Sequence, residues 1–374
     1  MAKKKTTKKK KSERTEKVKS LLTSKRKKEV PQYLSSGSSL FNMALTGNPD
    51  HGFATGSYTY LVGDSMSGKT WFSLSCMAEA SIDSRFDEYR FIYDNVERGA
   101  RMSMERFFGK RMADRLEPPR WDGGAAVFSQ TIEDMYFHLD DALDDGRPFI
   151  YVVDSMDSLS AEADDEKFKS RKKKARGNST EDESGSYGTA KAKANSTMLR
   201  TVMGKLEESG SILVVISQTR DNIGFGSQYN PRTRSGGRAL RFYADVEVWT
   251  SVIRQVKKTY RGKKRPIGTV VKLEVQKNRN NGKMSTVEVP FFYSVGIDEV
   301  GSMVDYLVGE GVWEEAKKTK TITATGLGPE LHGRRETLIK TLEEQDMVPD
   351  LRELCSQVWQ EIEEAIAVKR KSRY

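Results

Sequence analysis

Cysteine and histidine are scarce in this chain of 374 residues, which has only 2 cysteines and 3 histidines. Cys76 and Cys355 lie far apart in apolar segments, so they form neither a disulfide framework nor a metal site. The histidines have no cysteine or histidine neighbours at the spacing of metal ligands. No apolar run approaches the length of a membrane span, and the N-terminus lacks the apolar core of a signal peptide. These absences predict a soluble, intracellular protein.

The charge balance is basic, with a formal net charge of +10 and a pI near 9.3. An excess of this size favours nucleic acid or another polyanion as a partner. Much of it lies in residues 1–29, which we expect to be a basic, largely disordered tail. That tail is open to three interpretations: a solvated tail, a DNA-tethering arm or a nuclear address. The remaining length accommodates one large α/β domain, 30–300, and a smaller helical one, 301–374.

The segment YTYLVGDSMSGKT, residues 58–70, predicts a strand, a glycine-rich loop and the start of a helix. Its loop has the spacing G-x-x-x-x-G-K-T, in which backbone N–H groups surround a phosphate at a helix N-terminus. Lys69 is expected to reach the β and γ phosphates, and Thr70 to bind Mg²⁺. The predicted nucleotide-binding residues of this loop are Gly63, Asp64, Ser65, Met66, Ser67, Gly68, Lys69 and Thr70.

Two further predicted strands end in carboxylates. PFIYVVD ends at Asp154, the pattern in which a buried strand offers one carboxylate to the Mg²⁺ beside a phosphate loop. RFIYDNVE places both Asp94 and Glu97 at a strand end, where either carboxylate could orient the water that attacks the γ phosphate. Asp157 is better explained as a helix cap or turn residue than as a second metal ligand.

Two segments are predicted to be mobile loops. Residues 161–197 carry almost no large apolar side chains and contain a block of basic residues. Residues 219–237 follow an apolar strand that ends in Gln218, and they mix glycine and arginine with Ile223, Phe225 and Tyr229. Basic and stackable side chains on a flexible loop are typical of surfaces that bind single-stranded nucleic acid. Upstream, residues 35–47 predict a helix that begins at serine and ends at Gly47.

The order of these motifs resembles the RecA family of recombinases over roughly residues 30–315. The matching segments, in order, are SSGSSLFNMAL, GDSMSGKT, FIYDNVE, YVVDSMDSL, ISQTRDNIGFG, RSGGRALRFYA and VQKNRN. The resemblance implies an α/β, RecA-like P-loop ATPase core with a mostly parallel sheet. It also implies a DNA-dependent ATPase that uses ATP and Mg²⁺, forms filaments on single-stranded DNA and pairs that strand with homologous duplex DNA.

The resemblance also implies roles for particular residues. Glu97 is similar to the glutamate that activates water, with Asp94 as its rival, and Gln218 to the glutamine that senses the γ phosphate. Phe242 resembles an interface residue, while Lys277 and Arg279 resemble basic residues that reach the ATP of the neighbouring subunit. The first DNA-binding loop would lie within 161–197 and the second at 219–237. The residues implied to bind DNA are Tyr187, Arg220, Ile223, Gly236 and Gly237.

Two alternatives remain open at the level of sequence. One is a ring-forming RecA-fold ATPase or helicase-like DNA motor, and the other is a scaffold that binds ATP without hydrolysing it. Single-strand binding or mediator proteins are candidate partners of the recombinase. The expected location is the cytoplasm of a bacterial or phage-infected cell, or the nucleus if the host is eukaryotic.

Overall fold

The computed structural model describes residues 32–175, 189–221, 232–234, 237–328 and 330–370. The larger unit of the chain is Tyr33–Tyr374, and of the residues before it only Gln32 is described. The predicted tail, 1–29, therefore lies outside the described residues. Within the described part of the chain, no helix is both long and apolar enough to cross a membrane.

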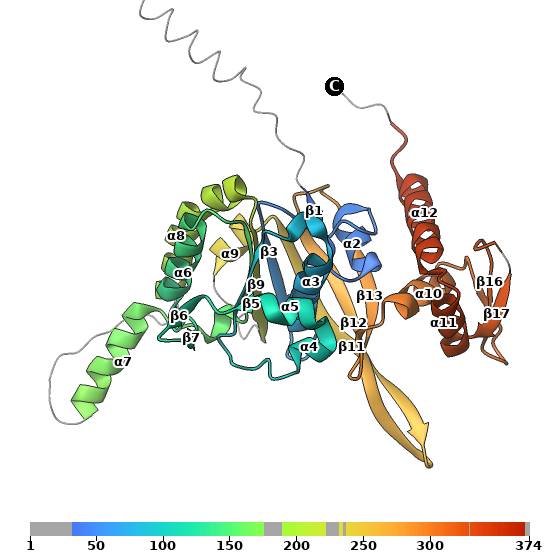
Figure 1. Cartoon of the computed structure of the whole chain (residues 1–374), viewed down its shortest axis with the longest axis horizontal. Coiled ribbons are helices and arrows are strands. Elements are labelled where there is room, and N and C mark those ends of the chain that lie inside the picture. Colours follow the sequence, from blue (N-terminus) through green and yellow to red (C-terminus); the bar gives the residue numbers. More distant parts are fainter. Residues whose placement is uncertain (1–31, 176–188, 222–231, 235–236, 329, 371–374) are drawn as a thin grey trace, which may run out of the picture. The chain divides into compact units, whose positions relative to one another are not determined.

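A central sheet organises the larger unit (Figure 1), and within the described residues it has ten strands. Its order is β14-β13-β12-β11-β3-β9-β8-β4-β5, with β10 paired to β9. The pairs from β11 through β3, β9, β8 and β4 to β5 are parallel, whereas β11 to β14 are antiparallel. The strands are β3 (Ser57–Gly63), β4 (Arg90–Asp94), β5 (Leu116–Glu117), β8 (Phe149–Val153), β9 (Ile212–Asp221), β10 (Arg232–Arg234), β11 (Val246–Tyr260), β12 (Lys263–Asn278), β13 (Thr286–Phe292) and β14 (Gly296–Ile297). This architecture confirms the predicted RecA-like α/β fold.

Helices cover both faces of the sheet because the strands alternate apolar side chains between two cores. In β8, Ile150 and Val152 belong to the core beneath α2 (Ser39–Thr46) and α3 (Lys69–Ile82), whereas Phe149 and Tyr151 belong to the other. That second core is covered by α6 (Ile132–Asp144) and α8 (Thr189–Ser209) (Figure 1). The shorter elements are β1 (Tyr33–Leu34), β2 (Phe53–Ala54), η1 (Ser84–Phe86), α4 (Met104–Phe108), α5 (Lys110–Arg115), β6 (Arg120–Asp122), β7 (Ala125–Val127), η2 (Met156–Ser158) and α9 (Arg238–Tyr243).

The predicted helix near residue 40 is confirmed, with its end at Gly47, although it begins at Ser39 rather than near residue 35. Ser38 caps α2 by accepting a hydrogen bond from the backbone N–H of Phe41, and Gly47 ends it in the left-handed conformation at φ 83°. Leu40 and Phe41 are both buried, so this short helix is part of the core.

The predicted loops contain regular structure. Residues 162–175 form α7 (Glu162–Ala175), and α8 begins at Thr189, so the prediction of a structureless segment is wrong for both parts of 161–197. Lysine, glutamate, arginine and alanine are strong helix formers even without an apolar face, and the sparse apolar residues here indicated exposure rather than coil. Within 219–237, Thr219–Asp221 belong to β9 and pair with β10. Residues 176–188, 222–231 and 235–236 lie outside the described residues.

The C-terminal segment is helical, as predicted, but it also contains a small sheet. Its helices are α10 (Glu299–Gly309), α11 (Arg335–Glu344) and α12 (Val348–Ile366). Between α10 and α11, the strands β15 (Glu314–Glu315), β16 (Thr321–Ala324) and β17 (Leu331–Arg334) pair antiparallel. The prediction missed this sheet although β16, with the sequence TITA, is rich in β-branched residues.

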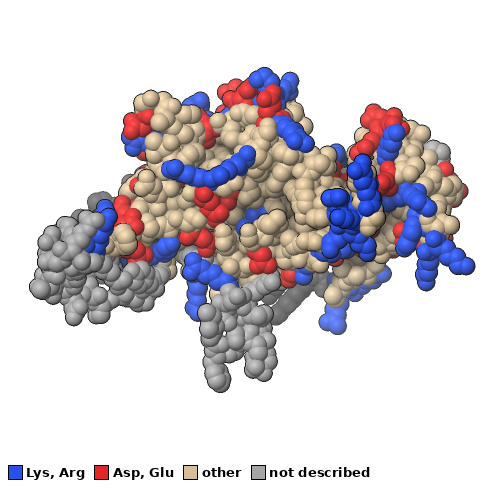
Figure 2. Space-filling model, turned by 90° about the horizontal axis from the view of Figure 1, so that it is seen from below, with Lys and Arg blue, Asp and Glu red and all other residues tan. Residues whose placement is uncertain are grey.

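The hairpin formed by β11 and β12 is long, with strand pairing as far as Tyr260 and Lys263, so only Arg261 and Gly262 form the turn. Residues 257–266 are exposed (Figure 1). Among residues 254–265, seven are Lys or Arg and none is Asp or Glu. On the surface seen from below, Lys and Arg gather to the right of centre (Figure 2).

Two glycines, one inside α8 and one directly after it, are expected to change the free energy of unfolding in opposite directions when each is replaced by alanine. Gly204 lies inside the helix with nothing within 4 Å of an added Cβ, so Gly204→Ala should raise the free energy of unfolding by about 0.5–1 kcal/mol. Gly210 follows the helix at φ 70°, so Gly210→Ala should lower it by about 1 kcal/mol. Urea denaturation of both variants measures this, and equal effects would contradict the helix boundary.

Candidate nucleotide-binding site

The predicted phosphate loop lies between β3 and α3, and its two end glycines are sterically required. A Cβ on Gly63 would lie 2.1 Å from Thr250 Oγ1 and 2.4 Å from the Thr250 carbonyl oxygen. Gly68 precedes α3 at φ 84°, a backbone conformation that favours glycine. Met66, at φ 61°, is the exposed outermost side chain of the loop. The first turn of α3 thus starts at Lys69, directly behind the loop.

Lys69 is almost fully buried within the loop. Its Nζ donates hydrogen bonds of 2.8 Å to the Gly63 carbonyl and 2.6 Å to the Asp64 carbonyl. Burial lowers the pKa of Lys69, and nearby carboxylates, Asp154 and Glu97 foremost, act in the opposite direction. An ammonium group held by main-chain carbonyls can exchange them for the oxygens of a phosphate.

Thr70 and Asp154 are hydrogen-bonded to each other beside the phosphate loop. Thr70 Oγ1 donates to Asp154 Oδ2 at 2.7 Å, and Tyr93 OH donates to the same oxygen at 2.9 Å. Burial raises the pKa of Asp154, while these two hydrogen bonds lower it. A hydroxyl and a carboxylate are oxygen ligands that suit Mg²⁺. In the described residues no cluster of three or more His, Cys, Asp or Glu side chains could hold a metal ion.

Of the two rival carboxylates, only Glu97 lies beside the phosphate loop. Its Oε1 accepts hydrogen bonds from Ser155 Oγ, from Ser158 Oγ at 3.2 Å and from Gln218 Nε2 at 3.0 Å. The structure therefore brings Glu97 and Gln218 into direct contact although they are 121 positions apart.

Asp94 points to a different environment. It is fully buried, and it accepts hydrogen bonds from the Ser129 N–H at 3.1 Å, from Ser129 Oγ at 2.5 Å and from Tyr151 OH at 3.2 Å. Burial raises its pKa, and these hydrogen bonds lower it. Its contacts hold the loop at Ser129 to the sheet.

A cavity of about 470 Å³ joins the loop to an aromatic wall that the sequence did not reveal. Met66 to Thr70, Glu97 and Asp154 line one side, and the rings of Trp71, Phe107, Phe291 and Tyr293 line the other. The Trp71 ring packs edge-on against Phe107, with ring centroids 4.9 Å apart, and against Phe291 at 4.7 Å. Trp71 directly follows the GKT motif, which was the one available signal.

Lys277, Arg279 and Phe242 come together at the C-terminal end of α9, away from this cavity. Lys277 Nζ donates to the carbonyls of Arg241 and Phe242, and Arg279 Nη2 donates to the carbonyl of Phe242 at 2.9 Å. Phe242 is 67% exposed. Burial and the neighbouring Arg279 lower the pKa of Lys277 to about 8. Neither Lys277 nor Arg279 lines the cavity at its own phosphate loop.

The predicted DNA-binding residues are only partly described. Arg220 lies on β9 with its side chain 61% exposed, and Arg220 Nη2 is 3.8 Å from Asp157 Oδ1. Gly237 precedes α9 at φ 82°, and a Cβ there would lie 2.9 Å from the Ala192 Cβ of α8. Tyr187, Ile223 and Gly236 lie outside the described residues.

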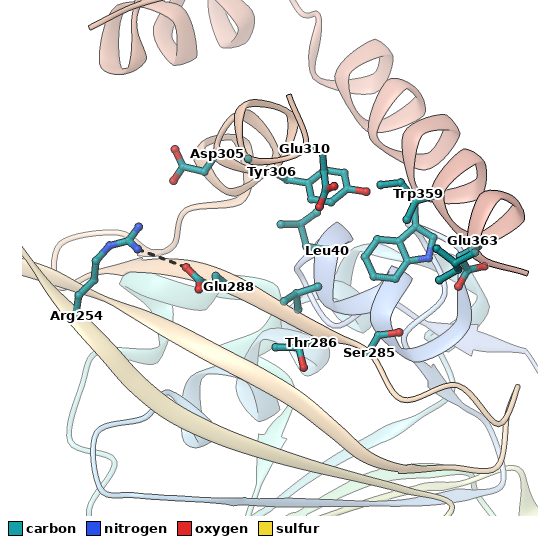
Figure 3. Close-up of a pocket in the computed structure, with 14 residues that line it drawn as sticks. Leu40, Arg254, Ser285, Thr286, Glu288, Asp305, Tyr306, Glu310, Trp359 and Glu363 are labelled. Atoms are coloured by element: carbon teal, nitrogen blue, oxygen red, sulfur yellow. Dashed lines mark hydrogen bonds and ion pairs between the residues drawn. The ribbon is translucent and has the colours of Figure 1, made fainter. Parts of the chain in front are cut away.

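A second cavity of about 620 Å³ lies between α10, α12, α2 and β13, remote from the phosphate loop (Figure 3). Its floor includes Leu40 and its walls carry Tyr306 and Trp359. Three carboxylates at its rim, Glu288, Asp305 and Glu363, pair with Arg254, Arg335 and Lys283. A fourth carboxylate, Glu310, also lines the cavity (Figure 3).

Comparison with known proteins finds similarity to one protein family and to several proteins named RecA. The RecA N-terminal domain family matches residues 171–298. Protein RecA of Cytophaga hutchinsonii is 27% identical over 313 residues, covering 79% of this chain and 75% of the relative. Protein RecA of Chlorobaculum tepidum is 28% identical over 286 residues, covering 75% and 71%. Protein RecA of Streptococcus pyogenes serotype M5 is 26% identical over 298 residues, covering 77% and 70%.

Because Asp94 and Glu97 lie in different environments, replacing each with alanine should change the free energy of unfolding by different amounts. Asp94→Ala leaves three buried donors without their acceptor and should lower the free energy of unfolding by about 1–3 kcal/mol. Glu97→Ala, at an exposed side chain, should change it by no more than about 0.5 kcal/mol. Urea denaturation at pH 7 compares them, and a larger loss for Glu97→Ala would reverse the assignment.

Proposed function

This chain is a divergent member of the RecA family, and on that basis we propose that it is an ATP-dependent recombinase. It assembles on single-stranded DNA, pairs that strand with homologous duplex DNA and exchanges strands. Its cofactors are ATP and Mg²⁺, and DNA stimulates hydrolysis of ATP to ADP and phosphate. The ATPase core is residues 30–300, and residues 301–374 form the C-terminal domain.

The observation that carries this proposal is the hydrogen bond from Gln218 Nε2 to Glu97 Oε1. Gln218 is the last residue of β9 paired with β3, opposite Gly63, and the chain continues directly to Arg220. A glutamine that contacts the water-orienting carboxylate can transmit the state of the nucleotide along its own strand. The segment that follows, 219–237, is the one expected to bind DNA.

The remaining contacts supply the chemistry of an ATPase. Lys69 would hold the phosphates of ATP, and Thr70 with Asp154 would hold the Mg²⁺ that neutralises phosphate charge. Glu97 orients a water molecule toward the γ phosphate and accepts its proton. The aromatic wall of Trp71, Phe107 and Tyr293 offers flat apolar surface for the adenine base at the other end of the cavity.

Three side chains at the end of α9 support an interface with a neighbouring subunit: Phe242, Lys277 and Arg279. Phe242 is an exposed aromatic side chain, and Lys277 and Arg279 both donate to its carbonyl oxygen. Exposed aromatic and cationic side chains in one place are typical of interface hot spots. We assign Phe242 to packing against the next subunit, and Lys277 and Arg279 to contacts with the triphosphate bound there.

The hairpin of β11 and β12 provides a second surface for nucleic acid. Its exposed part carries Lys257, Lys258, Arg261, Lys263 and Lys264 around Tyr260, whose ring lies 5.3 Å from the Arg261 guanidinium carbon. A basic two-stranded ribbon binds phosphates through counterion release. Strand exchange requires one protein to hold two DNA molecules, and this surface belongs to a different part of the sequence from the segment that follows Gln218.

Replacing the water-orienting carboxylate tests the proposal. Single-stranded DNA should stimulate ATP hydrolysis by the unaltered protein, and Glu97→Gln should lower kcat about 10²–10⁴-fold while ATP-dependent DNA binding remains. Phosphate release with and without single-stranded DNA measures the first effect, and fluorescence anisotropy of a labelled strand measures the second. Glu88→Gln, at an exposed glutamate before β4, is the matched control and should behave as the unaltered protein does.

Other experimental outcomes would indicate a different function. Absence of DNA-stimulated hydrolysis together with absence of strand pairing overturns the recombinase proposal. Closed rings and duplex unwinding, seen by electron microscopy and a helicase assay, identify a DNA motor. Unchanged activities in Glu97→Gln identify a scaffold that does not depend on hydrolysis.

The pKa of Lys277 predicts a pH-dependent assembly. Because this pKa is about 8, the charged fraction of Lys277 falls as pH rises from 7 to 9, from about 0.9 to about 0.1. Assembly on single-stranded DNA with a slowly hydrolysed ATP analogue should therefore weaken over this range. Lys277→Arg keeps the positive charge and should flatten the profile, measured by sedimentation. An identical profile for Lys277→Arg would show that another group titrates.

A further inference from the structure

Asp157 contacts both Gln218, whose side chain reaches Glu97, and Arg220, which is expected to bind DNA. It lies in η2, three residues after Asp154, and its side chain is only 10% exposed. Its Oδ2 accepts hydrogen bonds from the Gln218 backbone N–H at 2.6 Å and from Ser217 Oγ at 2.8 Å. Asp157 therefore fixes the main chain of β9 at the residue whose side chain contacts Glu97.

The second oxygen of the same carboxylate faces Arg220. Asp157 Oδ1 is buried and has no hydrogen-bond partner among the described residues, and Arg220 Nη2 lies 3.8 Å away. A buried carboxylate oxygen without a donor is costly, so it attracts the nearest cation. Arg220 is mostly exposed and can turn either to this oxygen or to a phosphate outside.

We propose that Asp157 is a positioning residue that holds Gln218 in place through its backbone and restrains Arg220 in competition with the phosphates of DNA. The inference rests on the proposed function, because it assumes that Arg220 binds single-stranded DNA. One carboxylate then links two residues near the C-terminal end of β9 that the function requires: the glutamine beside Glu97 and the arginine at the start of the DNA-binding segment. Engaging DNA requires Arg220 to leave Asp157.

Two substitutions separate the two roles of Asp157. Asp157→Asn retains a carbonyl oxygen that can accept from Gln218 N–H and Ser217 Oγ, but it removes the charge that attracts Arg220. Nucleotide-free binding of an oligothymidylate should then tighten about two- to fivefold, the range of a partly exposed ion pair. The slope of log K against log salt concentration should steepen by about 0.7, one additional phosphate contact.

Asp157→Ala removes both contacts and should also reduce the stimulation of ATP hydrolysis by single-stranded DNA. The charge control is Glu208→Gln, which removes one negative charge from an exposed side chain near the end of α8, outside both expected DNA-binding loops. It should leave the salt slope unchanged. In the Arg220→Gln background, Asp157→Asn should no longer affect DNA binding, because the restrained group is gone.

The outcomes are distinguishable. If the unaltered protein binds single-stranded DNA and DNA stimulates its ATPase, but Asp157→Asn has the same slope and affinity, the restraint of Arg220 is overturned and the recombinase proposal stands. If Asp157→Asn tightens DNA binding equally in the unaltered and the Arg220→Gln backgrounds, the restraint is also overturned, because Arg220 is then not the residue that Asp157 restrains. If the unaltered protein fails to bind single-stranded DNA, both proposals are overturned together.

Discussion

The parallel register of the central strands is the constraint on which the candidate site depends. Gly63 at the end of β3 pairs opposite Gln218 of β9, and Asp94 of β4 pairs opposite Val153 of β8. Backbone hydrogen bonds in a parallel sheet fix these positions, so the loops that follow emerge along one edge. Close packing of Gly63 against Thr250 of β11 fixes the start of the phosphate loop as well. Contacts between groups far apart in sequence are therefore a product of the sheet.

Much of the fold and the nucleotide side of the site could be predicted because the signals are local. Gly63 to Thr70 and Asp154 follow apolar runs that identify buried strands, and the capped helix at α2 has serine and glycine at its ends. The choice between Asp94 and Glu97 could not be made from sequence, because it depends on Ser129 and Gln218, which only folding brings near. The aromatic wall was missed for the same reason: Trp71, Phe107 and Phe291 come from three separate segments.

Exposed segments were harder to predict than buried ones, since their structure follows propensity rather than apolar pattern. In α7 a run of charged residues forms a helix without an apolar face, and in the β11–β12 hairpin a basic sequence forms paired strands. Both have compositions that are equally compatible with disorder. Lys258 pairs with Arg265 in the exposed part of the hairpin and Val248 with Val275 in its buried part, with register shifts between the two pairs.

The charges around Lys69 explain why a nucleotide would have to arrive with its metal. Asp154, Glu97, Asp64 and Asp157 all act on this one buried lysine, so the carboxylates nearby outnumber it. A bare triphosphate entering such a site would meet repulsion from Asp154 and Glu97 at short range. A divalent cation held by Thr70 and Asp154 would offset that repulsion. Ser155 and Gln218 donate hydrogen bonds to Glu97 and disperse its charge, which would lessen the repulsion between this carboxylate and a phosphate bound nearby.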